Sequence, residues 1–272
     1  MELSSFLPIA AVMLATGLVA GVIAGMLGVG GGIVIVPVLE YLLQYTSIPG
    51  DWRMNVAVAT SLATIIPTSI SSSRAHHARA AVDLPLVRSW ALPMLIGALA
   101  GSLLAARVHS STLALLFAVI AIIVSIKMLL PLDQFKLRDA APRGFGGGAL
   151  AASIGAASAM MGVGGGTLSV PTMSLCGVAI HRAIGTASLF GLVISLPGTV
   201  GYLFAKPGAI MPWSTIGLVN LAGVALIAPG SMLTAPLGAR IAHRLSRSVL
   251  TRVFAVFLLL VAARLLFRSL RV

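Results

Sequence analysis

The chain has 272 residues, of which 58% are hydrophobic and 9% charged, and its formal net charge is +12. Soluble domains carry about 25% charged residues, so this chain has too little polar surface to cover a water-exposed globule. Apolar stretches long enough to cross about 30 Å of hydrocarbon recur along the whole sequence, which excludes a soluble protein with a single membrane anchor. We therefore expect a multi-pass protein embedded in a lipid bilayer.

The positive charge does not indicate a nucleic-acid partner. The 18 Lys and Arg residues fall largely in short gaps between apolar segments, which is typical of cytoplasmic loops in membrane proteins, and no soluble basic domain is present. The single cysteine, Cys176, excludes a disulfide within the chain. The N-terminus lacks the basic region of a signal peptide, so the first apolar segment is expected to be a retained helix.

In chain order, the first half contains apolar segments, expected to be membrane helices, at about 6–27, 33–46, 55–73, 89–106 and 112–130. A polar linker follows at 131–143. The second half contains a matching series at about 145–161, 167–180, 184–205, 212–237 and 248–268. Prolines inside several of these segments kink a membrane helix rather than end it. The expected fold is an all-α polytopic membrane protein with about five segments in each half.

The two halves are homologous. Aligned without a gap, residues 26–37 and 160–171 are identical at eight of twelve positions, including the string Gly-Val-Gly-Gly-Gly and a later proline. Downstream, Ala57-Val-Ala-Thr60 corresponds to Ala183-Ile-Gly-Thr186, and the order of the matches is kept. We therefore expect a duplication of roughly 130 residues, with a first half at 1–130 and a second half at 144–272.

An odd number of crossings in each half would turn the second half upside down relative to the first. The basic residues support this, because the gap at 74–88 holds three arginines while its counterpart holds Lys206 alone, and the next pair of gaps shows the reverse. We expect an inverted repeat with a cytoplasmic linker and both termini outside. The three arginines after residue 263 disagree with that placement, so a parallel arrangement of four plus four segments stays open.

The repeated glycine string is the predicted substrate site. Each string precedes a segment of only 14 residues, which as a helix reaches about 21 Å and is too short to span the hydrocarbon comfortably. Short, glycine-broken segments at matching places of two halves point to a transporter's binding site. Free N–H groups and the positive end of the helix dipole would favour an anion there. The residues concerned are Gly28, Gly30, Gly31, Gly32, Gly162, Gly164, Gly165 and Gly166. The alternative is that the glycines only allow tight helix crossing.

Few other polar groups are placed to assist. The hydroxyls of Thr60, Ser61, Thr186 and Ser188 lie early in the third segment of each half, where they either donate to substrate oxygens or bond to their own helix. Asn55 and His181 occupy matching places. Arg182 either pairs with an anion or marks a helix end. Glu40 and His181 are the candidate coupling residues, because no acidic residue follows Asp139 and a relay of paired carboxylates is not expected.

At these residues the sequence resembles the TauE/SafE family of sulfite and sulfonate exporters. The resemblance rests on Gly-Met-Leu-Gly-Val-Gly-Gly-Gly at 25–32, its repeat at 162–166 with Pro171, and His181-Arg-Ala-Ile-Gly-Thr186. It implies export of sulfite or a small organosulfonate across the bacterial inner membrane by alternating access, driven by an H⁺ or Na⁺ gradient. The first half departs from the pattern, because Asn55-Val-Ala-Val-Ala-Thr60 lacks the His-Arg pair.

Other functions stay open at this level. An enzyme is not expected, because no nucleophile elbow, carboxylate pair or His-Glu-x-x-His pattern occurs, and no metal or cofactor is implied. A passive anion channel and a transporter of sulfate, thiosulfate or a carboxylate are the alternatives. The sequence says nothing about the oligomeric state.

Overall fold

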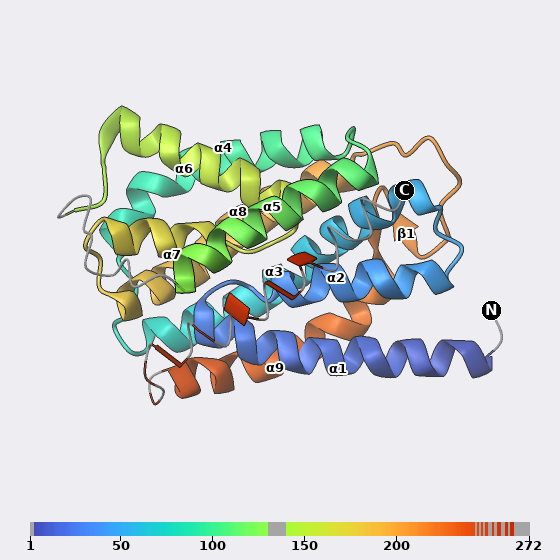
Figure 1. Cartoon of the computed structure of the whole chain (residues 1–272), viewed down its shortest axis with the longest axis horizontal. Helices are drawn as coiled ribbons and strands as arrows, with labels where there is room; N and C mark the ends of the chain where they lie inside the picture. Colours follow the sequence, from blue (N-terminus) through green and yellow to red (C-terminus); the bar gives the residue numbers. More distant parts are fainter. Residues whose placement is uncertain are drawn as a thin grey trace.

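The structure, a computed structural model, is a bundle of helices that run along one long axis (Figure 1). It describes residues 3–129 and 140–242 and scattered positions between 244 and 263. The helices are α1 (Leu3–Leu27), α2 (Gly32–Leu42), α3 (Arg53–His77), α4 (Leu84–Ala105), α5 (Ser110–Leu129), α6 (Gly144–Met161), α7 (Gly166–Leu175), α8 (Ile180–Leu203) and α9 (Leu221–Ala242). Two 3-10 turns, η1 (Leu43–Tyr45) and η2 (Gly50–Trp52), precede α3, and the strands β1 (Thr215–Ile216) and β2 (Val219–Asn220) form an antiparallel hairpin before α9.

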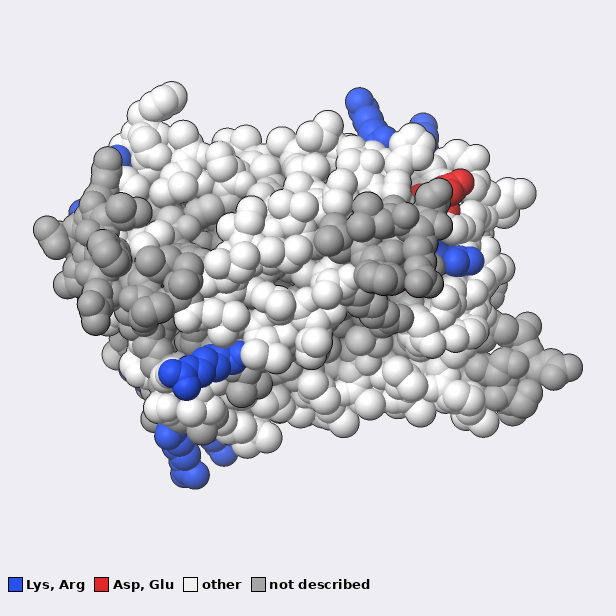
Figure 2. Space-filling model, viewed as in Figure 1, with Lys and Arg blue, Asp and Glu red and all other residues white. Residues whose placement is uncertain are grey.

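Six of the described helical stretches are long and apolar enough to cross a membrane. They are Leu7–Leu27, Gly50–His77, Leu84–Ala105, Gly144–Met161, Ile180–Leu203 and Leu221–Ala242. On the face shown in Figure 2, the Lys, Arg, Asp and Glu residues that are described lie toward the two ends of the long axis. This arrangement leaves apolar helix surface for the hydrocarbon and charge for the two interfaces. The prediction of an all-α polytopic membrane protein is confirmed.

The segments after the glycine strings are even shorter than predicted. Helix α2 has 11 residues and α7 has 10. Several other boundaries were wrong. Arg74 lies in the last turn of α3 and Arg88 in the second turn of α4, so most of the gap at 74–88 is helical. Long arginine side chains reach water from inside a helix end, and charge therefore marks a helix boundary only to within a few residues.

The boundaries of the fourth segment of the second half were also wrong. The segment predicted at 212–237 begins as a helix only at Leu221, after the β1–β2 hairpin, and it continues to Ala242. The linker prediction falls mostly on residues 130–139, which lie outside the described residues. The described positions between 248 and 263 are helical, in agreement with a last segment there.

Glycines at four-residue spacing bring two pairs of helices into close contact. A Cβ atom on Gly25 of α1 would overlap the carbonyl oxygen of Ala235 in α9, and one on Gly97 of α4 would overlap that of Ala152 in α6. Along each pair the contacting residue numbers rise together, so α1 runs parallel to α9 and α4 runs parallel to α6. These spaced glycines therefore serve close helix packing.

The helix contacts repeat when the halves are exchanged. If α1, α3 and α4 are matched with α6, α8 and α9, the α1–α9 contact becomes α6–α4, and the α3–α9 contact becomes α8–α4. Helices α3 and α8 contact each other and are the most deeply buried of the candidate spans. The two glycine strings therefore lie beside a buried centre that both halves build in the same way.

Candidate substrate site at the two glycine turns

The two glycine strings form turns that touch each other across the boundary between the halves. Helix α1 ends before Gly28–Gly32 and α6 ends before Gly162–Gly166, and all ten residues are buried. The N–H of Gly164 donates to the carbonyl oxygen of Val29 over 3.0 Å. A Cβ atom added to Gly164 would lie 3.1 Å from the Cα of Gly30. The sequence predicted both turns, and the structure brings them into direct contact.

The close approach of the two turns depends on glycine at equivalent positions of the two halves. A Cβ on Gly32 would overlap the carbonyl oxygen of Gly162, and a Cβ on Gly166 would overlap that of Gly28. These two contacts are equivalent, because exchange of the halves converts one into the other. Real Cβ atoms do not approach backbone oxygens so closely, so any larger residue would push the turns apart. Tight packing is thus one role of these glycines.

The two central helices hold the turns in the same manner. A Cβ on Gly28 would overlap the carbonyl oxygen of Ile184 in α8, while one on Gly162 would lie 2.7 Å from the Cα of Val58 in α3. Val58 and Ile184 are counterparts in the repeat. Ser61 of α3 adds a hydrogen bond, donating to the carbonyl oxygen of Gly162 over 2.8 Å. Each turn is therefore held by a helix from the opposite half.

Identical sequence adopts two backbone conformations at these turns. Gly28 and Gly162 agree, with φ of 68° and 69°. The next glycines do not: Gly30 and Gly31 have φ of 73° and 80°, whereas Gly165, the counterpart of Gly31, has φ of −56°. Glycine adopts left-handed and right-handed backbone about equally well. The string Val-Gly-Gly-Gly is therefore able to exist in both states, and this chain contains one copy of each.

Backbone donors are available at both helix starts. Within the described part of the chain, the N–H groups of Gly30, Gly31 and Gly32 have no hydrogen-bond acceptor, and the same holds for Gly165 and Gly166. Buried N–H groups normally have partners, because an unpaired one costs free energy comparable to a lost hydrogen bond. The positive ends of the α2 and α7 dipoles add to the local potential. These are the donors that an anion site requires.

Three buried hydroxyls without a described partner come from α7, α6 and α3. Thr167, in the first turn of α7, is buried, and so are Ser158 of α6 and Ser69 of α3; none of their hydroxyls has a partner among the described residues. The counterpart of Thr167 is Ile33, and Gly30 packs against Ile65. The sequence prediction missed these three hydroxyls. For Thr167, the signal was a polar residue where the first half has isoleucine, at one of the four positions that differ within the aligned twelve.

The predicted threonines anchor helix starts. The Oγ1 atom of Thr60 accepts from the N–H of Asn220 over 2.9 Å, and the Oγ1 of Thr186 accepts from the N–H of Asp83 over 2.9 Å. The side chains of Asn220 and Asp83 then accept from the first turns of α9 and α4, which is the usual role of such residues at a helix N-terminus. Each threonine thus positions the start of a helix of the other half. Its contact with substrate stays a prediction.

Replacing Thr60 or Thr186 by valine is expected to lower the free energy of unfolding by about 1–3 kcal/mol, because a buried N–H would lose its acceptor. The measurement is the thermal or chemical unfolding of the purified protein in detergent. Ser153→Ala is the control, since its exposed hydroxyl bonds only to its own helix. Equal stability of Thr60→Val and the control would contradict this assignment.

Two further predicted polar residues also have backbone partners. Asn55 donates from Nδ2 to the carbonyl oxygens of Ala105 and Val108, at 3.1 and 2.9 Å, and thereby satisfies the C-terminal end of α4. Ser188 donates to the carbonyl oxygen of Gly185, one turn earlier in its own helix, over 2.6 Å. This is the bonding to the helix that the sequence left open as the alternative.

The predicted charged residues lie near the ends of helices. Arg182, in the first turn of α8, pairs with Asp83 at 3.8 Å, and both side chains are partly exposed. His181 beside it is exposed, while Glu40 is buried near the end of α2. Arginine at a helix start opposes the helix dipole, and Asp83 offsets this cost. The structure therefore places Arg182 at a helix end next to a carboxylate.

Comparison with known proteins identifies the family. The family described as sulfite exporter TauE/SafE matches residues 13–265. The chain belongs to this family. A "Probable membrane transporter protein" of Haemophilus influenzae is 34% identical over 92% of this chain and 95% of its own length. The "Probable membrane transporter protein YunE" of Bacillus subtilis is 27% identical over 95% and 97%, and a "Probable membrane transporter protein" of Xylella fastidiosa is 27% identical over 95% of each chain. No solved structure matches the chain.

Membership of the TauE/SafE family confirms the resemblance that the glycine strings indicated. With six candidate spans and relatives that carry the name of membrane transporters, the chain is a multi-pass membrane transporter, as predicted for a protein of the bacterial inner membrane. The relatives match over nearly their whole length, so the chain contains the same membrane unit that they do.

Proposed function

We propose that this TauE/SafE protein is a secondary transporter that exports a small oxyanion, sulfite or a small organosulfonate, by alternating access. The family description names sulfite export, and the site offers what such an anion needs. Backbone N–H groups at two facing helix starts provide donors, and Thr167, directly after Gly166, adds a buried hydroxyl that has no partner among the described residues. A small tetrahedral or pyramidal oxyanion accepts several such bonds at once.

The observation that carries this proposal is the presence of one glycine string in two backbone states at a single contact. If the first turn adopts the conformation of the second while the second adopts that of the first, the helix contacts are remade with their counterparts. The two states then have similar free energies. Alternating access requires this, because both the inward-facing and the outward-facing conformation must be populated. In each state a different half would have its turn and its short helix displaced, so the site would face one side of the membrane at a time.

This scheme rests on an inverted repeat. Exchange of the halves converts the α1–α9 contact into the α6–α4 contact, and the chain enters α1 and α6 from opposite ends of the bundle (Figure 1). The opposite directions of α1 and α6 support inversion over a parallel arrangement of four plus four segments, whereas the exchanged contacts support the repeat itself. Inverted repeats are a common basis for alternating access around a central site.

The coupling ion is H⁺ or Na⁺ in this scheme. Glu40 is the buried carboxylate among the described residues and His181 is a titratable group at the start of α8, and these two remain the candidate coupling residues. No acidic residue follows Asp139 in the sequence, so the second half has no carboxylate to contribute to a relay.

A counterflow assay in proteoliposomes tests the function. Vesicles loaded with unlabelled sulfite under anaerobic conditions are expected to accumulate labelled sulfite from outside, because an alternating-access carrier exchanges substrate across the membrane. Sulfate, thiosulfate, sulfoacetate and a small carboxylate added outside then rank the anions by competition. Flux that follows the electrical potential and does not respond to sulfite on the far side would indicate a channel and refute the carrier. Competition by a carboxylate alone would refute the sulfur oxyanion as substrate.

A further inference from the structure

A cleft lined by arginines lies between α3 and α9. It has a volume of about 620 Å³ and is lined by Ser71, Arg74, Arg79, Met232, Pro236 and Arg240, with two alanines of the α3 end. Arg74 and Arg79 come from the end of α3 and the turn after it, whereas Arg240 comes from the last turn of α9. Three positive charges from two halves of the chain therefore converge on one cleft.

Among the described residues, the arginines of this cleft have no acidic partner. No carboxylate lines it, and in the described part of the chain none of the three forms an ion pair with Asp or Glu. Arg79 donates one N–H to the carbonyl oxygen of Ala75 over 2.6 Å, which leaves the rest of its guanidinium available. Guanidinium groups stay protonated at any physiological pH and match the geometry of phosphate and related oxyanions. In the part of the chain that the structure describes, the cleft therefore presents a positive site for an oxyanion without a carboxylate to offset it.

Part of the α9 side of the cleft is apolar, formed by Met232 and Pro236. Met232 is 44% exposed there, and Pro236 follows one turn later. The hydroxyl of Ser71 is not available, because it donates to the carbonyl oxygen of Met232 over 2.8 Å. This bond fastens α3 to α9 at the mouth of the cleft. An occupant would therefore meet charge at one end and hydrocarbon surface at the other.

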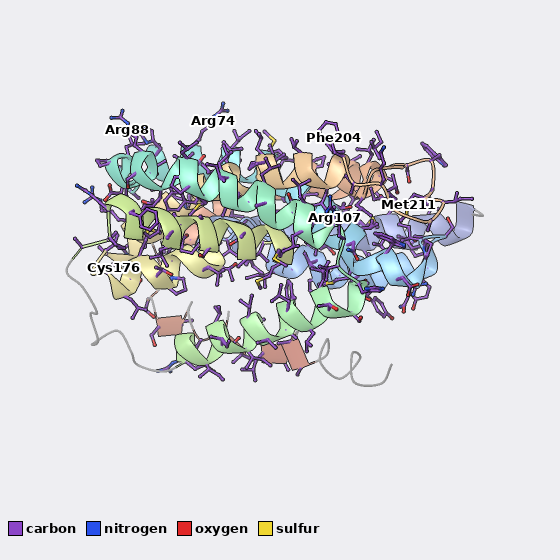
Figure 3. All side chains as sticks on the ribbon, turned by 90° about the horizontal axis from the view of Figure 1, so that it is seen from above. Arg74, Arg88, Arg107, Cys176, Phe204 and Met211 are labelled. Carbon is purple, nitrogen blue, oxygen red and sulfur yellow. The ribbon has the colours of Figure 1, made fainter. Side chains whose placement is uncertain are left out.

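The position of the cleft along the helices corresponds to a membrane interface. Its arginines lie in or just beyond the last turns of two candidate spans, which end at His77 and Ala242, whereas Met232 and Pro236 lie further back along α9. Arg74 also projects outward from the side of the bundle (Figure 3). Lipid phosphates lie at this level, just outside about 30 Å of hydrocarbon, and basic side chains at helix ends reach toward them.

We propose that this cleft binds the oxyanion group of a ligand of phosphate type, with an anionic phospholipid headgroup as the occupant that its apolar wall favours. The acyl chains would lie along Met232 and Pro236, and the phosphate would contact Arg74, Arg79 and Arg240. By joining the ends of α3 and α9, such a lipid would stabilise the bundle at this end. A soluble oxyanion in the same place would use the same arginines without the apolar wall.

The test uses the full chain purified in an uncharged detergent, with phosphatidylglycerol, phosphatidylcholine and sodium sulfate as probes at constant ionic strength. The variants are R74Q/R240Q and the charge-matched control R88Q/R107Q, whose arginines are exposed and lie outside the cleft. Binding is followed by thermal unfolding and by native mass spectrometry, which counts retained lipids. A third variant, R74K/R240K, keeps the charge and checks that a loss does not come from misfolding.

Wild type and R88Q/R107Q are expected to bind phosphatidylglycerol alike, and R74Q/R240Q about 25-fold more weakly, since each basic residue near the surface contributes about fivefold. R74K/R240K is expected to recover most of the affinity. A different result is that sulfate stabilises the wild type but not R74Q/R240Q, while phosphatidylglycerol has no effect. That result would support the oxyanion site and assign it to a soluble anion. Equal responses of R74Q/R240Q and R88Q/R107Q to every probe would overturn the proposal.

Discussion

Gly32→Ala and Gly166→Ala are each expected to lower sulfite exchange at least tenfold. In both variants the new methyl group would overlap a carbonyl oxygen of the opposite turn, that of Gly162 or of Gly28. Overpacking of this kind costs about 1–3 kcal/mol, and here it acts at the contact whose remaking is proposed to change access. The two substitutions are expected to have similar effects, because they are counterparts in the repeat.

The measurement is counterflow in proteoliposomes at equal protein content, with Gly50→Ala and Gly146→Ala as controls. Neither control glycine has an atom within 4 Å of an added Cβ, and neither has a positive φ. The controls are expected to transport like the wild type. If Gly32→Ala exchanges sulfite at the wild-type rate, the turns need not approach as closely as they do here. That result would remove the central support for the proposed mechanism.

Gly25→Leu and Gly97→Leu are expected to prevent correct assembly of the bundle. A Cβ alone at either position would overlap the backbone of the parallel partner helix, α9 or α6, and a leucine side chain is far larger. Helices in a membrane associate through close packing rather than through exclusion of water, so separated helices lose most of their attraction.

Size-exclusion profiles and thermal unfolding in detergent measure this effect. Gly148→Leu is the matched control: it replaces a glycine on α6 whose added Cβ would meet only the side chain of Pro93, at 3.5 Å. The control is expected to remain monodisperse and to unfold near the wild-type temperature. A monodisperse and stable Gly25→Leu protein would show that the α1–α9 contact can loosen without loss of the fold.

Different measurements test the proposals for the arginine cleft and for the glycine turns. Transport by R74Q/R240Q tests whether an occupied cleft matters for the cycle, whereas lipid retention tests the cleft itself. A variant that loses the lipid but keeps exchange would place the cleft outside the transport cycle and leave the proposed function intact.

The sequence determined much of this protein. The apolar segments and their repetition predicted the membrane bundle, because hydrocarbon admits only helices with satisfied backbones or closed barrels. The glycine strings predicted two turns and two short helices. These features are local, and a local pattern is sufficient to determine them.

The tertiary structure decided which conformation each glycine turn adopts and what each polar side chain does. Glycine permits both left-handed and right-handed backbone at Gly31 and Gly165, so the choice between φ of 80° and −56° depends on the neighbours that pack against each turn. Thr60 and Thr186 received partners 160 and 103 residues away in the chain, and Arg74 met Arg240 in one cleft. Contacts of this range depend on how the helices pack together, which no single segment specifies.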